Sequence, residues 1–302
     1  MLKRVYVTND TGDSLEISLK SPEKSGFLIT DISGLGPVKA TINTSDISSR
    51  DGVFFNSARK SSRNIVFTFK LIATESGKSI EDVRFDSYTY FPVKKNIQLI
   101  FETDKATVYT TGYIEKNEPD IFSEKETISV SVICPDPFFK ALNDQVTVFN
   151  GVSENFEFPY ENEVGSGTDY GYIIQYTENN IAYTGSDEPG ITIYMHFLAT
   201  VTGAAIYNTR TKEFMKLDDD RITAIKGSSL SAGDDLVICT TKGHKLITLT
   251  SGGEVYNLLN ALTKDSSWLS LDLGDNLFAY DATAGKYQTQ LKVTNEILYE
   301  GI

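Results

Sequence analysis

The sequence predicts a mainly β protein built from two antiparallel modules, and three observations support that prediction. The chain contains 16 tyrosines and 17 phenylalanines, and aromatic residues favour strands. Many segments alternate apolar and polar residues, which is the pattern of a half-buried strand. At 302 residues, 40% hydrophobic and 23% charged, the chain has the length of two domains and the composition of a globular protein.

Three segments of the first half alternate clearly and are predicted to be strands, at 64–71, 96–103 and 126–134. The side chains that we expect on their buried faces are Ile65, Phe67, Phe69, Leu71, Ile97, Leu99, Phe101, Ile128, Val130 and Val132. Cys134 has the same parity as Val132, so its thiol is expected to pack as a small buried apolar group. Pro135 and Pro137 should end that strand, because proline cannot donate a ladder hydrogen bond.

One helix is predicted in the first half, within SIEDVRFDSYTYFP. Ser79 is a good N-cap and Asp82 lies three residues on, as in a capping box. Pro92 disfavours the helical conformation at the preceding residue, so the helix should stop by Tyr90. The face expected to pack against the sheet consists of Ile80, Val83 and Tyr88.

The segment PDPFFKALNDQ reads as the exit from the first domain, which gives domains at 1–139 and 140–302. The second half again looks strand-rich, with Ile191, Ile193, Met195 and Phe197 on one face of a strand. A hairpin is predicted at 234–251, with its turn near Lys242–Gly243. Residues 163–172 form the most flexible-looking loop. This pattern is typical of a second antiparallel sandwich.

The sequence contains few of the residue patterns that are typical of catalytic or metal-binding sites. Its two histidines, His196 and His244, have neither metal-ligand spacing nor cysteine neighbours, so we expect no transition-metal site. Its two cysteines, Cys134 and Cys239, form no disulfide framework. No GxSxG motif marks a serine nucleophile. The sequence therefore predicts a protein without enzymatic activity and without a cofactor.

Two further features can be interpreted either as a ligand-binding site or as a purely structural feature. Asp218, Asp219 and Asp220 could ligate calcium, but the glycine that a calcium loop needs is missing, so a solvated turn is expected. Trp268 could be a platform for a sugar, although a lone aromatic residue more often serves packing.

The net charge of −13 argues against a protein that wraps nucleic acid, because phosphates would be repelled. No apolar stretch approaches the length of a membrane span, and we expect no membrane insertion. The first residues, MLKRVYVTND, have no apolar run of the kind found in secretory signals. The chain is therefore expected to fold in the cytoplasm of the cell that makes it.

A local basic and aromatic cluster stands out against that acidic background. It consists of Arg50, Phe54, Phe55, Arg59, Lys60 and Arg63. The cluster could be a nucleic-acid patch, an active-site clamp, a surface that contacts another protein, or a solvated loop. The surrounding sequence reads as a projecting hairpin, whose edges can pair with another chain. In an acidic protein, a basic arm would find a complementary surface on an identical copy, so we favour a subunit contact.

Three ordered blocks, at 32–71, 79–104 and 111–139, resemble the N-terminal hub domain of distal tail proteins of tailed phages that infect Gram-positive bacteria. Three later blocks, at 206–217, 230–249 and 266–282, are similar to the C-terminal sandwich of the same family. The resemblance implies a β-sandwich hub with one helix and a projecting hairpin, followed by a galectin-like sandwich.

The same resemblance implies a virion component of the tail tip or baseplate. In this family six copies form a ring that joins the tail tube protein to the tail-tip and host-adhesion proteins, and DNA passes through the lumen. Residues 49–64 would then be the hairpin that clasps the adjoining subunit. Two other functions stay open: a carbohydrate-binding adhesin for the bacterial surface, and a wall hydrolase, which is suggested only by the abundant carboxylates.

Overall fold

The computed structural model describes residues 1–46, 48, 51–122, 126–154 and 171–302 of the chain. These residues form two compact units, the first comprising Met1–Leu142 with Leu298–Ile302 and the second Asn143–Ile297. The predicted boundary after residue 139 thus lies three residues early, and the last five residues return to the first unit. They do so because β23 (Leu298–Tyr299) pairs with β10 (Phe139–Ala141).

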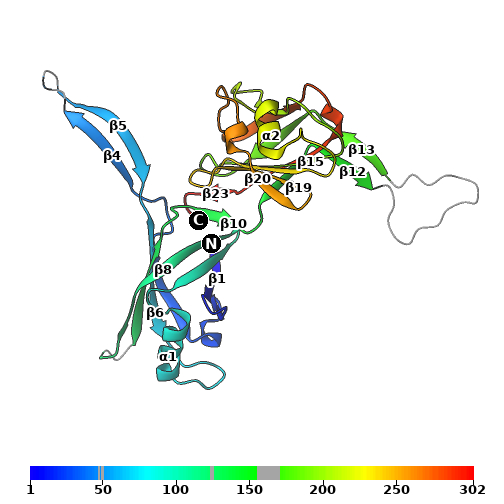
Figure 1. Cartoon of the computed structure of the whole chain (residues 1–302). Coiled ribbons are helices and arrows are strands. Elements are labelled where there is room, and N and C mark those ends of the chain that lie inside the picture. Colours follow the sequence, from blue (N-terminus) through cyan, green and yellow to red (C-terminus); the bar gives the residue numbers. More distant parts are fainter. Residues whose placement is uncertain (47, 49–50, 123–125, 155–170) are drawn as a thin grey trace, which may run out of the picture. The chain divides into compact units, whose positions relative to one another are not determined.

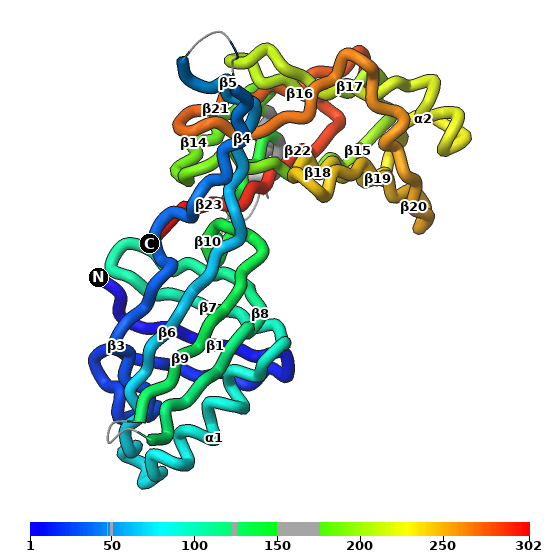
Figure 2. The backbone as a smooth tube through the Cα atoms, turned by 90° about the vertical axis from the view of Figure 1, so that its left-hand side faces the viewer, coloured from blue at the N-terminus to red at the C-terminus, as the bar shows by residue number. Residues whose placement is uncertain are grey.

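The first unit is built on one antiparallel sheet with the strand order β2-β1-β7-β8-β9-β6-β3. Its strands are β1 (Leu2–Asn9), β2 (Ser14–Ser18), β3 (Phe27–Ser33), β6 (Arg63–Leu71), β7 (Asn96–Thr103), β8 (Thr107–Asp120) and β9 (Thr127–Cys134). Figure 2 shows β3, β6, β9 and β8 side by side, in the order that their pairing requires.

This sheet folds over on itself and encloses its own core. All ten apolar side chains predicted on the buried faces of the three alternating segments are buried, and Cys134 is buried with them. Phe67 of β6 stacks on Phe101 of β7 with ring centroids 6.3 Å apart, although two strands lie between β6 and β7 in the sheet. Because neighbouring strands are spaced by about 4.8 Å, this contact requires two layers that face each other. The sandwich prediction for the first unit is confirmed.

Helix α1 (Ile80–Tyr90) begins and ends where the sequence predicts, but its buried face is different. Ser79 and Asp82 form the capping box, with the Ser79 side chain accepting from the backbone N–H of Asp82. Val83 is buried, whereas Ile80 and Tyr88 are exposed. The second buried residue is Ser87, four positions after Val83, since residues i and i+4 lie on one face of a helix.

Strands β4 (Ala40–Asp46) and β5 (Val53–Lys60) form a separate two-stranded antiparallel sheet. Figure 1 shows them as a ribbon of their own, separate from the main sheet of the first unit. All side chains of β4 and β5 are exposed except Lys60, which is half-buried. A projecting hairpin is therefore confirmed, but its strands lie at Ala40–Asp46 and Val53–Lys60, so the predicted bounds of 49–64 are wrong.

The second unit is an antiparallel sandwich. One sheet has the order β11-β22-β15-β18-β19-β20, from β11 (Gln145–Val148), β22 (Thr289–Asn295), β15 (Thr192–Phe197), β18 (Asp235–Cys239), β19 (Leu246–Ser251) and β20 (Glu254–Asn257). The other has the order β14-β21-β16-β17, from β14 (Glu178–Tyr183), β21 (Gly274–Asp281), β16 (Ala205–Asn208) and β17 (Phe214–Lys216). Both sheets contribute to one core, including the predicted Ile191, Ile193, Met195 and Phe197. The predicted hairpin at 234–251 is the pair β18–β19.

Short elements complete the chain. Strands β12 (Asn150–Glu154) and β13 (Gly171–Gln175) pair with each other, and 3-10 turns occupy Pro22–Lys24, Leu259–Ala261 and Lys286–Gln288. The loop predicted at 163–172 lies almost entirely outside the described residues. In the described part of the chain no helix is long and apolar enough to cross a membrane.

The aspartate run was predicted to be a solvated turn, and that prediction is wrong. Asp218 is the N-cap of helix α2 (Asp219–Lys226), and its carboxylate accepts from the backbone N–H groups of Asp220 and Arg221. The Asp219 carboxylate accepts from the backbone N–H of Gly203, at 2.8 and 3.1 Å. Acidic side chains are favoured at a helix N-terminus by the free N–H groups and the helix dipole. The run therefore starts a helix, anchored by the buried side chain of Ile222.

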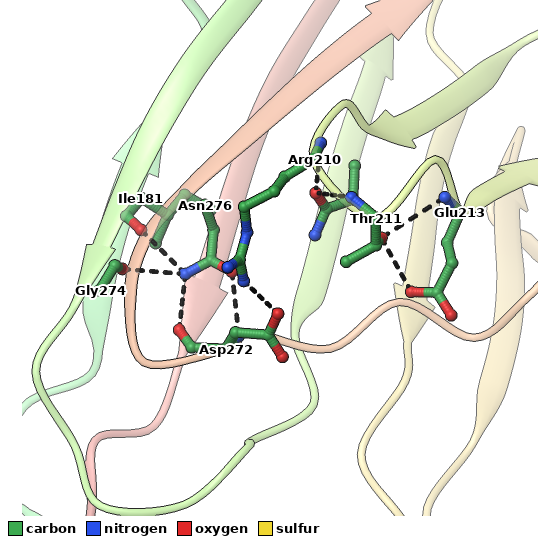
Figure 3. A network of polar contacts seen from close by, with 8 residues as sticks. Ile181, Arg210, Thr211, Glu213, Asp272, Gly274 and Asn276 are labelled. Carbon is green, nitrogen blue, oxygen red and sulfur yellow. Dashed lines mark hydrogen bonds and ion pairs between the residues drawn. The ribbon is translucent and has the colours of Figure 1, made fainter.

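A buried asparagine holds the loop before β21 in place, as Figure 3 shows. The side-chain N–H groups of Asn276 donate to the carbonyls of Ile181, Asp272 and Gly274, at 3.3, 2.7 and 3.0 Å. Its side-chain oxygen accepts from the backbone N–H of Asp272 at 2.9 Å. Arg210 forms an ion pair with the carboxylate of Asp272 from the other side of the loop. One amide side chain thereby joins the loop to strand β14.

Candidate interaction surface

The β4–β5 hairpin has one apolar face and one polar face. Cross-strand partners in an antiparallel pair point to the same side, so the pairing register defines both faces. The apolar face consists of Ala40, Ile42, Thr44, Val53, Phe55 and Ala58, with Asp46 and Lys60 at its two ends. The opposite face consists of Thr41, Asn43, Ser45, Phe54, Ser57 and Arg59.

A bulge produces this separation of the two faces. Asn43 pairs with Ser57 and Thr44 with Phe55, so Asn56 is an extra residue in β5. The extra residue changes the parity of the strand, which places Phe55 and Ala58 on the same face although they are three residues apart. Without the bulge, Phe55 would lie on the polar face, and Asn56 and Phe54 would take positions on the apolar face.

Side-chain hydrogen bonds rigidify the polar face. The Asn43 amide donates to the Ser57 hydroxyl at 3.0 Å, and the Ser45 hydroxyl donates to the Asn56 side-chain oxygen at 3.3 Å. The polar face is thus held by contacts within the hairpin.

The apolar face, in contrast, is open to solvent. Ile42, Val53 and Phe55 are 61%, 56% and 59% exposed. A two-stranded ribbon is marginally stable in water unless its apolar face is covered. An exposed apolar ribbon of this kind is typical of a surface that another chain covers.

Arg63 does not belong to this surface, and its predicted place among the exposed contact residues has to be corrected. It is 1% exposed. It has the parity of Ile65 in β6 and therefore points into the first unit. Its guanidinium donates to the carbonyl oxygens of Gly34, Gly36, Pro137 and Glu300.

The carbonyls around Arg63 come from the segment between β3 and β4, from the segment between β9 and β10, and from the C-terminal segment. The guanidinium also lies over the Phe139 ring, 4.1 Å from its centroid. Burial lowers the pKa of Arg63 from its usual value, but a guanidinium keeps its charge in a protein. Position 34 requires a glycine, because its φ is +84° and a Cβ there would lie 2.0 Å from the Asn64 carbonyl oxygen.

The other predicted residues lie along the hairpin. Phe54 is exposed on the polar face and Phe55 on the apolar face, and Arg59 is exposed. Lys60 at the base forms an ion pair with Glu300 at 2.6 Å and lies 4.5 Å from the Phe138 ring centroid. Arg50 lies outside the described residues.

The sequence interpretation missed Ile42, Val53 and Ala58 of the apolar face, and Glu300 at the hairpin base. The alternation in ATINTSD carries a signal for Ile42, because Ala40, Ile42 and Thr44 share one parity. Nothing in the sequence marks Glu300, since it meets Lys60 only through the pairing of β23 with β10.

The remaining candidate residues are scattered over the second unit. Trp268 is half-buried against the core, with the Lys245 ammonium 4.9 Å from its ring centroid. His196 lies 2.7 Å from the Asp235 carboxylate, and His244 is exposed. No group of three or more potential metal ligands occurs among the residues that the structure describes.

Comparison with solved structures identifies the fold. No family model and no curated protein matches the sequence. The chain is similar to phage hub proteins in its fold. The relative that shows this is the Dit (gp 19.1) protein of phage SPP1, described as a paradigm of the hub adsorption apparatus in phages that infect Gram-positive bacteria.

The SPP1 Dit likeness has a TM-score of 0.63 at 12% identity and covers 97% of this chain and 98% of that one. A chain of the phage p2 baseplate in its activated conformation with calcium gives a TM-score of 0.42 at 13% identity, with 97% and 98% coverage. The fold assignment rests on the SPP1 structure.

Proposed function

We propose that this protein is a structural hub of a phage tail tip, and that its copies join through the β4–β5 hairpin into a ring. The apolar face of the hairpin carries this proposal, because its side chains are exposed and no described part of the chain covers them. The fold shared with SPP1 Dit supports the hub role.

In this proposal the ring is a homohexamer in the virion, assembled from chains made in the host cytoplasm. It joins the tail tube protein on one side to the tail-tip and adhesion proteins on the other. DNA passes through the lumen without specific binding, which the net charge of −13 favours by repelling phosphate. The role is structural and leaves chemistry to other components of the tail.

Two exposed side chains of the hairpin provide the test. Replacing both Ile42 and Phe55 by serine should convert six-copy assemblies into monomers. The mid-point of thermal unfolding should stay within a few degrees of the wild type, because both side chains are exposed in the single chain. Light scattering coupled to gel filtration measures the mass, alone and with the tail tube protein present.

The matched control carries Phe54→Ser, which removes an exposed apolar side chain from the opposite face of the same ribbon, and it should assemble like the wild type. The proposal fails if the wild type is monomeric under both conditions, or if the apolar-face variant assembles as well as the control.

A second candidate function, binding of bacterial surface carbohydrate, is favoured by a shallow pocket of about 360 Å³ on the outer face of the six-stranded sheet. The pocket is lined by Tyr194, His196, Asp235 and Lys292, among others. An aromatic ring beside donors and an acceptor can bind a sugar.

Under this second proposal, Tyr194→Ala with Lys292→Ala should reduce retention on purified cell wall at least about tenfold, a loss of about 1.4 kcal/mol. A Trp268→Phe variant, altered outside the pocket, should retain wild-type binding. Equal retention of the wild type and the double variant would exclude the pocket as a sugar site.

A further inference from the structure

We propose that the apolar face of the hairpin of one copy fits into a groove on the next copy, formed where the two chain ends of the first unit meet. The groove is lined by Met1, Leu2, Leu35, Ala106, Tyr299 and Ile302, among others. The inference rests on the proposed ring and adds the surface that receives the hairpin.

The groove is a largely apolar hollow of about 590 Å³ within the first unit. The N-terminal strand, the β7–β8 turn, the segment after β3 and the C-terminal segment each contribute to its lining. A hydrogen bond from the Ile302 N–H to the Leu35 carbonyl, at 3.1 Å, and an ion pair between the Met1 ammonium and Asp104, at 2.6 Å, hold the chain ends in place. The groove is therefore preformed in the single chain.

The hairpin of the same chain does not fill this groove. Ile42, Val53 and Phe55 would be buried if it did, but each is more than half exposed. We therefore assign the groove to the hairpin of another copy. The eight residues of β5 span about 26 Å at about 3.3 Å per residue, so the hairpin offers a long surface to a neighbouring copy.

The pairing of a hairpin with a groove also satisfies the symmetry of a ring. A closed ring uses heterologous contacts, in which two different surfaces of the chain meet repeatedly around an axis. The hairpin is a projecting apolar surface and the groove a recessed one, so they are complementary in shape and polarity. Lys105 of the groove lining can pair with Asp46 at the tip of the apolar face, whereas the neighbouring Asp104 is already paired with the Met1 ammonium and Lys3. Charges at the rim of an interface can set its register.

Cysteine cross-linking in the full-length chain tests this contact. The background carries Cys239→Ser, because Cys134 is buried and burial raises the pKa of its thiol. One preparation carries Thr44→Cys on the apolar face, and a second carries Ala106→Cys in the groove. Mixed, equilibrated and treated with a short bismaleimide, they should give a covalent dimer containing one chain of each.

The matched control replaces Thr44→Cys by Ser45→Cys, the neighbouring residue on the polar face. We expect at least a tenfold lower yield of the mixed dimer from the control. A chain that carries both Thr44→Cys and Ala106→Cys should give a ladder of products up to six copies.

The outcomes separate this inference from the ring proposal. One outcome is that native mass spectrometry shows the six-copy assembly while Thr44→Cys links to Ala106→Cys no better than Ser45→Cys does. In that case the groove is not the surface that receives the hairpin, and the ring proposal is unaffected. If the chain forms no assembly, both proposals fail. Selective linking in the assembled state supports both.

Discussion

Replacing Arg63 by alanine is expected to lower the free energy of unfolding of the first unit by about 3–5 kcal/mol, because several buried carbonyls lose a charged donor at once. The guanidinium supplies five hydrogen bonds to four carbonyl oxygens, of Gly34, Gly36, Pro137 and Glu300. The substitution by alanine would also leave a cavity over the Phe139 ring, which the guanidinium covers. Hydrogen exchange of peptides from 63–71 and 97–103, measured against denaturant, reports on this unit.

Two variants serve as controls for Arg63. Arg63→Lys keeps the charge but not the planar fork, so it should recover only a small part of the loss. Arg59→Ala removes an exposed arginine of the neighbouring β4–β5 hairpin and should change the stability by no more than about 0.5 kcal/mol. A loss below about 1 kcal/mol for Arg63→Ala would contradict the role of this side chain as the anchor of the hairpin base.

The second large effect is expected at a buried ion pair of the second unit. Lys226 and Asp234 form an ion pair, and their side chains are 5% and 2% exposed. Lys226→Met should lower the free energy of unfolding by about 3–5 kcal/mol, because it leaves the buried carboxylate without its cation. The single tryptophan, Trp268, lies in this unit, so its fluorescence during denaturation measures the loss directly.

The pH dependence gives a check on the same pair. Burial by itself would raise the pKa of Asp234, but hydrogen bonds from Lys226, Ser251 and the Ser231 N–H outweigh it and hold the pKa below its usual value. A depressed pKa contributes stability above the unfolded-state pKa of about 3.9, and this stability is lost as the pH falls through the folded-state value. The difference between the wild type and Asp234→Asn should therefore be largest above about pH 5 and shrink below about pH 4. A difference that does not vary with pH would show that the carboxylate charge is not involved.

The alternation of apolar and polar residues predicted the buried faces of both units well, because a strand has a period of two and a shift of one residue would expose the whole face. The same alternation indicates that Arg63 is buried, since Arg63 has the parity of Ile65 and Phe67. The predicted strand begins at Asn64, one residue after the observed start of β6, which leaves Arg63 in the loop with the other basic residues. The carbonyls that bind Arg63 belong to distant segments, and a backbone carbonyl has no signature in the sequence.

Helix α2 was missed for a different reason. The local signals were present, with Asp218 as N-cap and Gly227 after the last turn in a left-handed conformation. However, Ile222 is the only buried residue of this eight-residue helix, so no apolar periodicity accompanied the caps. The apolar face of the hairpin was also incompletely predicted, because a bulge at Asn56 changes the parity in the middle of β5.

We expect copies of this chain to join through the β4–β5 hairpin, and averaged electron micrographs of the purified protein, alone and with the tail tube protein, will show whether they do. The expected result is rings of six copies around an open channel, with a two-stranded ribbon crossing each boundary between neighbouring copies. Single particles under both conditions, or rings whose boundaries the ribbon does not cross, would contradict it.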